Sequence, residues 1–369
     1  MKTKIFLFSL LVAFLSIGCS DDDDPVEVYG SKLEYKQITS DALANNPIGN
    51  STVRDIAIYT PDGYNPNGST KYPVVYLLHG LPFSEKSFID KQTWDQWIDP
   101  NGPFTTYPDF PQEGFRKWID NLIETEQIDP MIIVMPNAAS EKGYGFSWYT
   151  NSDLNGNFED YIVNDVVNYI DSRYNTIVDR NGRALIGHSQ GGYAAFKLGM
   201  KHSGKFGVVA SHSGLLLLEA FLAGSIPIVL AENPDGMNGP DQTKFLTSAL
   251  YSQAAAWSPN LNNPPYMVDL FFEYPSGNII PNVWIHWVEN DPFYMLDFYG
   301  GDFGSLNGIY FDVGEQDELG IGQLYHFLTQ KLDAMGITYS YEIHDGGHFN
   351  KMFSRMEVSL KFCSNNMTN

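Results

Sequence analysis

Gly187-His188-Ser189-Gln190-Gly191 is the stretch that decides the fold of this chain. The apolar residues 183–186 before it are typical of a short buried strand, and residues 192–198 after it have helical spacing. A strand that turns this sharply into a helix strains the backbone of the apical residue, and glycines two positions to either side prevent clashes. We therefore predict that Ser189 projects from the edge of a sheet as a nucleophile, at a helix N-terminus that favours developing negative charge.

Strand-like and helix-like segments alternate along most of the chain. Further strands are predicted at 53–59, 72–78, 131–135, 206–210, 308–313 and 338–343, and helices at 115–125, 158–174, 321–335 and 350–362. This alternation predicts an α/β protein with one doubly wound, mostly parallel sheet and helices on both faces. Residues from about 215 to 307 interrupt the pattern and are rich in Pro, Asn and aromatic residues. We predict that they form a lid-like, partly helical insertion over the carboxyl edge of the sheet.

The N-terminus has the features of a targeting segment. Residues 1–4 carry two lysines, residues 5–17 are apolar but too few to span a bilayer, and Cys19 follows a small residue. This pattern resembles a bacterial lipoprotein signal over residues 1–18, with Ser16 where Leu is more usual; an ordinary cleaved signal peptide is the alternative. We therefore expect an exported protein with lipid on Cys19.

An acidic run follows directly, and residues 19–30 are predicted to be a tether before a folded domain at 31–369. The run resembles the signal by which some Gram-negative bacteria send lipoproteins to the outer cell surface. Its composition is equally typical of a solvated spacer, and both interpretations can hold at once. These features predict an outer-membrane lipoprotein exposed at the cell surface.

Charge and cysteine content narrow the possible partners. The chain of 369 residues has 22 basic and 44 acidic side chains, a formal net charge of −22. This balance argues against nucleic acids and anionic polymers as partners and fits neutral or weakly charged substrates. Only Cys19 and Cys363 are present, so lipid on Cys19 leaves no intramolecular disulfide, and the fold must rest on its core.

A serine nucleophile needs a base, and the base needs an acid that fixes its orientation. In a fold of this kind the acid and then the histidine follow the serine along the chain. His348 lies in a Gly-Gly-His loop between the last predicted strand and the last helix, and we predict that it is the base. His344 is the competitor, but its place at the strand end favours a structural role.

The acid is predicted in the loop that follows residues 308–313. Asp317 is our choice and Glu315 the runner-up, while a helix N-cap is the structural alternative for this segment. An oxyanion hole needs two backbone N–H donors. We assign one to Gln190, after the nucleophile, and the other to Leu81, in the loop that His79-Gly80 begins.

Three further residues are candidates for binding substrate: Trp148, His286 and His79. Trp148 is placed by the pattern at the same edge as Ser189, although aromatic residues in such loops equally serve packing. His286 lies between two tryptophans in the insertion. For the side chain of His79 we expect a structural role rather than a catalytic one. Residues 153–157 lack the remaining ligands of a calcium loop, so no metal site is predicted.

The order and context of these motifs resemble the esterase D-like branch of the α/β-hydrolases. That branch includes feruloyl and acetyl-xylan esterases, S-formylglutathione hydrolases, siderophore esterases and mycobacterial mycolyltransferases. The motifs span most of the expected domain: Tyr76-Leu77-Leu78-His79-Gly80, Val134-Met135-Pro136-Asn137, Gly187-His188-Ser189-Gln190-Gly191-Gly192, Gly314-Glu315-Gln316-Asp317 and Gly346-Gly347-His348. Residues 215–307 are longer than the family usually carries there, which limits any transfer of substrate specificity.

The resemblance implies a serine esterase of the α/β-hydrolase fold that needs no metal or organic cofactor. Ser189 would attack the ester carbonyl, His348 would take its proton, and Asp317 would orient His348. The expected substrate is a feruloyl, acetyl or similar ester of a carbohydrate or related alcohol. Two alternatives stay open: an acyltransferase that uses the same triad, and a surface glycan-binding protein on a catalytically retired fold.

Overall fold

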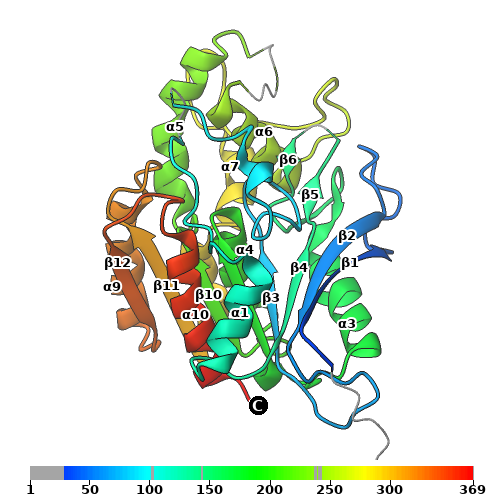
Figure 1. Cartoon of the computed structure of the whole chain (residues 1–369). Helices are drawn as coiled ribbons and strands as arrows, with labels where there is room; N and C mark the ends of the chain where they lie inside the picture. The colour runs from blue at the N-terminus through cyan, green and yellow to red at the C-terminus, as the bar shows by residue number, and fades with distance from the viewer. Residues whose placement is uncertain (1–28, 101–103, 143, 237–238, 240–242, 369) are drawn as a thin grey trace, which may run out of the picture.

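The computed structural model describes residues 29–100, 104–142, 144–236, 239 and 243–368. Within these residues the main sheet has eight strands in the order β1-β2-β4-β3-β9-β10-β11-β12 (Figure 1). Their bounds are β1 Lys32–Thr39, β2 Val53–Thr60, β3 Val74–Leu78, β4 Ile132–Pro136, β9 Arg183–His188, β10 Val208–His212, β11 Gly308–Gly314 and β12 Ser340–His344. β1 and β2 pair antiparallel with each other, as do β2 and β4, whereas the other neighbours are parallel.

Each strand and helix predicted from the sequence overlaps an element of the same type. The strands β3, β4 and β9 are buried along their whole length, as expected for parallel strands covered on both faces. The helix predicted over 158–174 is present as α2 Phe158–Asp160 and α3 Val167–Arg173, joined by a π-helical segment at Tyr161–Val166. The edge strand β1 was not among the predicted strands.

Helices cover both faces of the sheet, as two neighbouring residues of β11 show. Successive side chains of a strand point to opposite faces. The ring of Tyr310 packs 5.6 Å from that of Phe362 in α10 (Met352–Asn366), whereas Phe311 packs 5.5 Å from Phe196 in α4 (Gln190–Lys201). α1 (Phe115–Glu124) lies beside α10, and α9 (Tyr325–Ala334) lies on the α4 face. The chain therefore has the α/β-hydrolase fold.

The predicted insertion divides into two parts. α5 (Leu218–Glu232), α6 (Phe245–Trp257) and α7 (Pro281–Val288) lie beyond the carboxyl ends of the central strands (Figure 1). α8 (Pro292–Gly304) instead packs along α4 and leads into β11, so it is the crossover helix between β10 and β11. The added segment therefore ends before α8, earlier than residue 307.

The predicted signal segment and Cys19 lie outside the described residues. In the part of the chain that the structure describes, no helix is both long and apolar enough to cross a membrane.

Candidate active site

Ser189 occupies the turn between β9 and α4. Its backbone dihedrals, φ 56° and ψ −120°, lie in a region that residues with a Cβ rarely adopt. A Cβ on Gly187 would lie 2.0 Å from the carbonyl oxygen of Gly191, and one on Gly191 would lie 1.9 Å from that of Leu78. The two glycines are therefore a steric requirement of this turn, as the sequence predicted.

The structure brings Ser189, His348 and Asp317 together from three separate loops. The Oγ of Ser189 lies 3.0 Å from Nε2 of His348, and Nδ1 of His348 lies 2.8 Å from Oδ2 of Asp317. The His348 and Asp317 side chains are each about 1% exposed, so this chain of hydrogen bonds is shielded from bulk water. The predicted geometry, in which Asp317 meets the second ring nitrogen, is present.

Asp317 is held in its charged form despite its burial. Burial acts to raise the pKa of Asp317, but the neighbouring His348 and the hydrogen bonds it accepts hold the value below its ordinary range. One of these bonds comes from the N–H of Leu319, at 2.9 Å. An ionised acid at this place favours the His348 tautomer whose Nε2 faces Ser189 as an acceptor.

The two competing residues are placed elsewhere. Glu315 is exposed, and its backbone N–H donates to the carbonyl of His344 at 2.7 Å. The Nδ1 of His344 accepts the N–H of Gly346 at 3.2 Å, so His344 supports the loop that leads to His348. The structure therefore favours Asp317 over Glu315 as the acid and gives His344 a structural place.

Sequence reasoning missed two residues that hold the backbone of His348. The carboxylate of Glu318 accepts the His348 N–H at 2.6 Å. The Nε2 of His188 lies 2.6 Å from the His348 carbonyl oxygen and donates to it. Burial, with a contribution from His348, lowers the pKa of His188 to about 3, so this ring is neutral. Glu318 directly follows Asp317 and His188 directly precedes Ser189 in the sequence, and this adjacency was the signal that could have identified them.

The predicted oxyanion donors lie beside the nucleophile. Gln190 is the first residue of α4, where backbone N–H groups have no partner within the helix. A Cβ on Gly80 would lie 3.0 Å from the Cβ of Ser189 and 3.3 Å from the nitrogen of Gln190. Gly80 is therefore packed directly against the turn, and the assignment of the Leu81 and Gln190 N–H groups as oxyanion donors stays a prediction.

The side chains predicted to bind substrate are mostly committed to other contacts. The indole of Trp148 is buried and donates to Ser252 Oγ at 2.9 Å, while its backbone N–H meets the Gln190 side-chain oxygen when that amide is turned toward it. His79 is also buried, and its Nε2 accepts the N–H of Ala138 at 2.9 Å.

His286 is exposed on α7, with Nδ1 3.6 Å from Glu289 Oε2. Trp148 and His79 are thus engaged in contacts within the protein and His286 lies at the surface, and a role of the three residues in substrate binding stays a prediction.

Aromatic residues cover the triad. The ring of Phe104 stacks on His348 at 5.6 Å, and Phe245, the first residue of α6, lies 5.3 Å from Phe104. Ser189 is only 8% exposed. The inserted segment therefore reaches to within one aromatic ring of the base, as the lid hypothesis requires.

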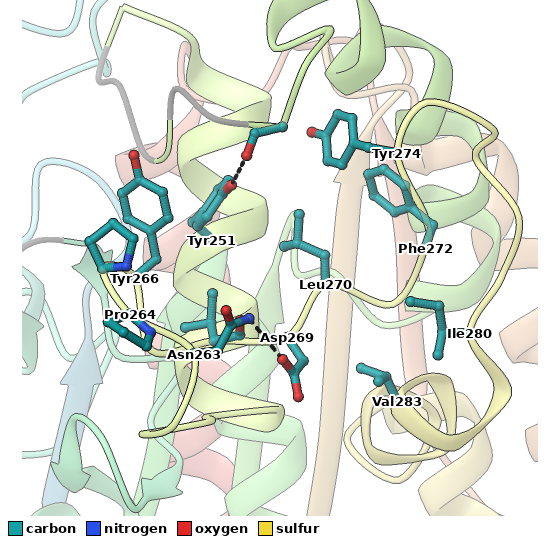
Figure 2. A pocket seen from close by; sticks show the side chains of 13 residues that line it. Tyr251, Asn263, Pro264, Tyr266, Asp269, Leu270, Phe272, Tyr274, Ile280 and Val283 are labelled. Carbon is teal, nitrogen blue, oxygen red and sulfur yellow. Dashed lines mark hydrogen bonds between the residues drawn. The ribbon is translucent and has the colours of Figure 1, made fainter.

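Two cavities involve the inserted segment. One, of about 390 Å³, lies between α5 and the loop that carries Asp317, and its wall includes Gly224, Phe245 and Glu318. The other, of about 710 Å³, lies within the insertion (Figure 2). Its wall combines four aromatic rings with an amide and a carboxylate: Tyr251, Tyr266, Phe272, Tyr274, Asn263 and Asp269. No group of three or more His, Cys, Asp or Glu side chains among the described residues is placed to hold a metal ion.

Comparison with known proteins identifies the family of the chain. Residues 51–354 match the family model described as "Putative esterase", so the chain belongs to this esterase family. The chain is similar to the esterase Rv1288 of Mycobacterium tuberculosis (strain ATCC 25618 / H37Rv), with 28% identity over 204 residues. The match covers 54% of this chain but only 35% of that protein.

Two solved structures share the fold. A ferulic acid esterase is 20% identical with a TM-score of 0.57, and the alignment covers 92% of this chain and 100% of the other. FphF, a fluorophosphonate-binding serine hydrolase of Staphylococcus aureus, is 17% identical with a TM-score of 0.55, covering 91% of this chain and 99% of the other. At these identities the likeness concerns the fold alone.

Proposed function

We propose that the protein hydrolyses carboxylic esters through an acyl-enzyme on Ser189. The observation that carries this proposal is the hydrogen-bond chain from Ser189 Oγ through His348 to Asp317. It is the arrangement that activates a serine hydroxyl for attack on a carbonyl. Family membership supports the same activity.

The geometry defines a two-step reaction. Ser189 Oγ attacks the carbonyl carbon while Nε2 of His348 takes its proton, and the N–H groups of Gln190 and Leu81 bind the oxyanion. The intermediate collapses when His348 protonates the departing alcohol. Water, deprotonated by His348, then attacks the acyl-enzyme, and the acid leaves as the proton returns to Ser189.

We infer that the ester joins an acyl group, such as feruloyl or acetyl, to a neutral carbohydrate or related alcohol, as in the esterase D-like branch. The net charge of −22 disfavours anionic substrates. The cavity in the insertion supports the sugar part, because aromatic faces with an amide and a carboxylate suit a neutral polyol. Its Tyr251 lies six residues from Phe245 on α6, about 9 Å along the helix axis.

A fluorophosphonate probe tests the activity. Wild-type protein should react covalently and turn over nitrophenyl acetate, nitrophenyl butyrate or methyl ferulate, whereas Ser189→Ala should do neither. Equal labelling of both proteins, or no labelling of wild-type protein, would reject the proposed function. The relative rates on the three esters identify the preferred acyl group.

We also propose that the mature protein is an outer-membrane lipoprotein, anchored at Cys19 and exposed at the cell surface. This rests on the basic, apolar and acidic segments of residues 1–24. A surface enzyme of this kind would meet esters released from polymers outside the cell.

A further inference from the structure

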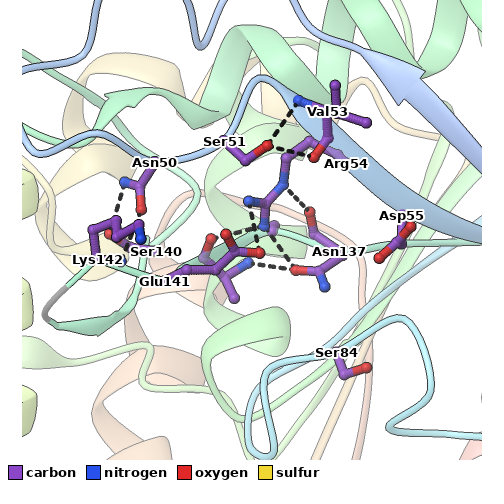
Figure 3. A network of polar contacts seen from close by, with 12 residues as sticks. Asn50, Ser51, Val53, Arg54, Asp55, Ser84, Asn137, Ser140, Glu141 and Lys142 are labelled. Carbon is purple, nitrogen blue, oxygen red and sulfur yellow. Dashed lines mark hydrogen bonds and ion pairs between the residues drawn. The ribbon is translucent and has the colours of Figure 1, made fainter.

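A buried arginine contacts the loop that follows β4 and is linked through that loop to His79. Arg54 of β2 is 1% exposed, and its guanidinium is enclosed by the loop that follows β4 (Figure 3). Its Nε donates to the Asn137 carbonyl at 3.1 Å, and Nη2 donates to Asn137 Oδ1 and the Ala139 carbonyl, each at 2.8 Å. Nη1 lies 3.1 Å from Glu141 Oε1. One planar cation thus fixes both ends of the turn that contains Ala138.

Ala138 transmits this constraint to His79. The Ala138 N–H donates to Nε2 of His79 at 2.9 Å, so the neutral ring must carry its proton on Nδ1. Nδ1 lies 3.0 Å from the carbonyl oxygen of Gly80 and donates to it. Burial of His79 lowers its pKa to about 4, which keeps the ring neutral under ordinary conditions. The turn held by Arg54 therefore sets both the tautomer and the direction of this imidazole.

The last link is a single peptide plane. The carbonyl of Gly80 and the N–H of Leu81 belong to the same planar group and point in opposite directions. That carbonyl accepts bonds from His79 Nδ1 and from the N–H of Phe83 at 2.9 Å. Fixing the carbonyl fixes the N–H, which is the proposed oxyanion donor.

We propose that Arg54 is a positioning residue for the oxyanion hole, acting through Asn137, Ala138 and His79 on the Leu81 N–H. The inference rests on the proposed esterase function, because only a reaction with an oxyanion gives that N–H a catalytic task. Arg54 touches no reacting atom. Its contribution is to prevent rotation of the Gly80–Leu81 peptide, so that the donor is in place before the oxyanion forms.

Two variants test the connection. Arg54→Lys keeps the charge near Glu141 but cannot make three hydrogen bonds in one plane. Asn137→Ala removes the amide that accepts from Arg54 and from the Ala139 N–H, at 2.8 and 3.0 Å. Asn50→Ala is the matched control: Asn50 is also buried and bonds Ser140 and Asn155 in the same region, but it holds neither Ala138 nor His79.

We expect Arg54→Lys and Asn137→Ala to lower kcat on nitrophenyl butyrate by about ten- to a hundredfold, with KM within about twofold, since a misaligned donor weakens transition-state binding. The affinity for an alkyl boronic acid, whose tetrahedral adduct places an oxygen in the oxyanion hole, should fall in parallel. Asn50→Ala should keep kcat even if its Tm falls. Circular dichroism confirms that each variant is folded.

The 15N NMR signals of the His79 ring provide a readout that is independent of turnover. They should show Nδ1 protonated in wild-type protein and a mixture of tautomers in both variants. An unchanged ring signal in Arg54→Lys and Asn137→Ala would overturn the inference, as would unchanged kcat or an equal loss in Asn50→Ala. Absence of turnover and of labelling in wild-type protein would instead reject the proposed function.

Discussion

Ser189 combines a strained backbone with an acid–base pair buried beneath aromatic rings. Its conformation is retained because the neighbouring glycines allow the strand and helix to approach closely. Around it, His348 is held at four points: its ring by Ser189 and Asp317, its N–H by Glu318 and its carbonyl by His188. The proposed base is therefore oriented in the structure without substrate, which would lower the cost of reorganisation during the reaction.

Substitutions of the three carboxylates near His348 should separate their roles. Asp317→Asn should lower kcat by about a thousand- to ten-thousandfold, because the neutral amide no longer favours the required tautomer. Glu318→Gln, which weakens the bond to the His348 backbone, should lower it by about tenfold or less. Glu315→Gln is the control and should keep wild-type kcat. Initial rates on nitrophenyl acetate measure all three, and an effect of Glu315→Gln as large as that of Asp317→Asn would reverse the assignment of the acid.

At the scale of elements, α5 and α6 shape the space beside the acid loop. Gly224 lies in the wall of the 390 Å³ cavity, and a Cβ there would meet no atom within 4 Å. Gly224→Leu should therefore fill the cavity without distorting α5. If this cavity receives the acyl group, kcat/KM for methyl ferulate should fall by about tenfold or more while that for nitrophenyl acetate is retained.

Gly301→Leu is the control for this change. Gly301 lies on α8, is exposed, and a Cβ there also meets nothing within 4 Å. The substitution gives the same gain in helix propensity without approaching the cavity. A parallel loss of activity on all esters in Gly224→Leu would contradict a role for the cavity in acyl selection.

The helix α4, which begins after the proposed nucleophile, carries a buried lysine. Lys197 is 1% exposed and donates to Thr150 Oγ1 at 2.5 Å and to Asn290 Oδ1 at 3.1 Å, so it ties α4 to two loops. Burial lowers the pKa of Lys197 from 10.5 to about 7. Between these values the unfolded chain binds a proton that the native protein lacks, so the free energy of unfolding should rise with pH across this window.

Lys197→Met should remove that dependence. The wild-type free energy of unfolding minus that of the variant should increase between pH 7 and pH 10, by at most about 1.4 kcal/mol per pH unit. Lys201→Met is the control. Lys201 lies one turn further along α4 with its side chain 32% exposed, and this variant should keep the rise of the free energy of unfolding with pH. Urea titrations at several pH values measure the difference, and a flat or falling curve would show that Lys197 stays charged in the native protein.

At the scale of the whole molecule, the proposed anchor at Cys19 precedes the described domain in the sequence. Cys19→Ala should release the protein from the membrane fraction, because it removes the proposed site of lipid attachment, and it should leave kcat unchanged, because residue 19 is not among the proposed catalytic residues. Cys363→Ala is the matched control: Cys363 is buried in α10, and its loss should leave the protein in the membrane fraction. Fractionation of lipid-labelled cells measures how much of each variant is in the membrane fraction. Retention of Cys19→Ala in that fraction would contradict lipidation at residue 19.

Much of this protein follows from local sequence patterns. The alternation of segments determined the α/β fold class, and the glycine spacing determined the turn at Ser189, because both depend on contacts between near neighbours in the chain. The order of Ser189, Asp317 and His348 followed from the same topology. These features were predictable because local periodicity and glycine spacing specify each element, and the order of the elements can be read along the chain.

Only the tertiary structure decided which side chains meet. It shows that Asp317, and not Glu315, bonds the His348 ring. It also shows that Glu318 and His188 bond the His348 backbone and that His286 is at the surface. It also joined Arg54 to Asn137, in the loop that follows β4, across 83 residues of sequence. Such contacts depend on how loops from distant strands pack together, and hydrophobic periodicity specifies which face is buried but not which polar groups become neighbours.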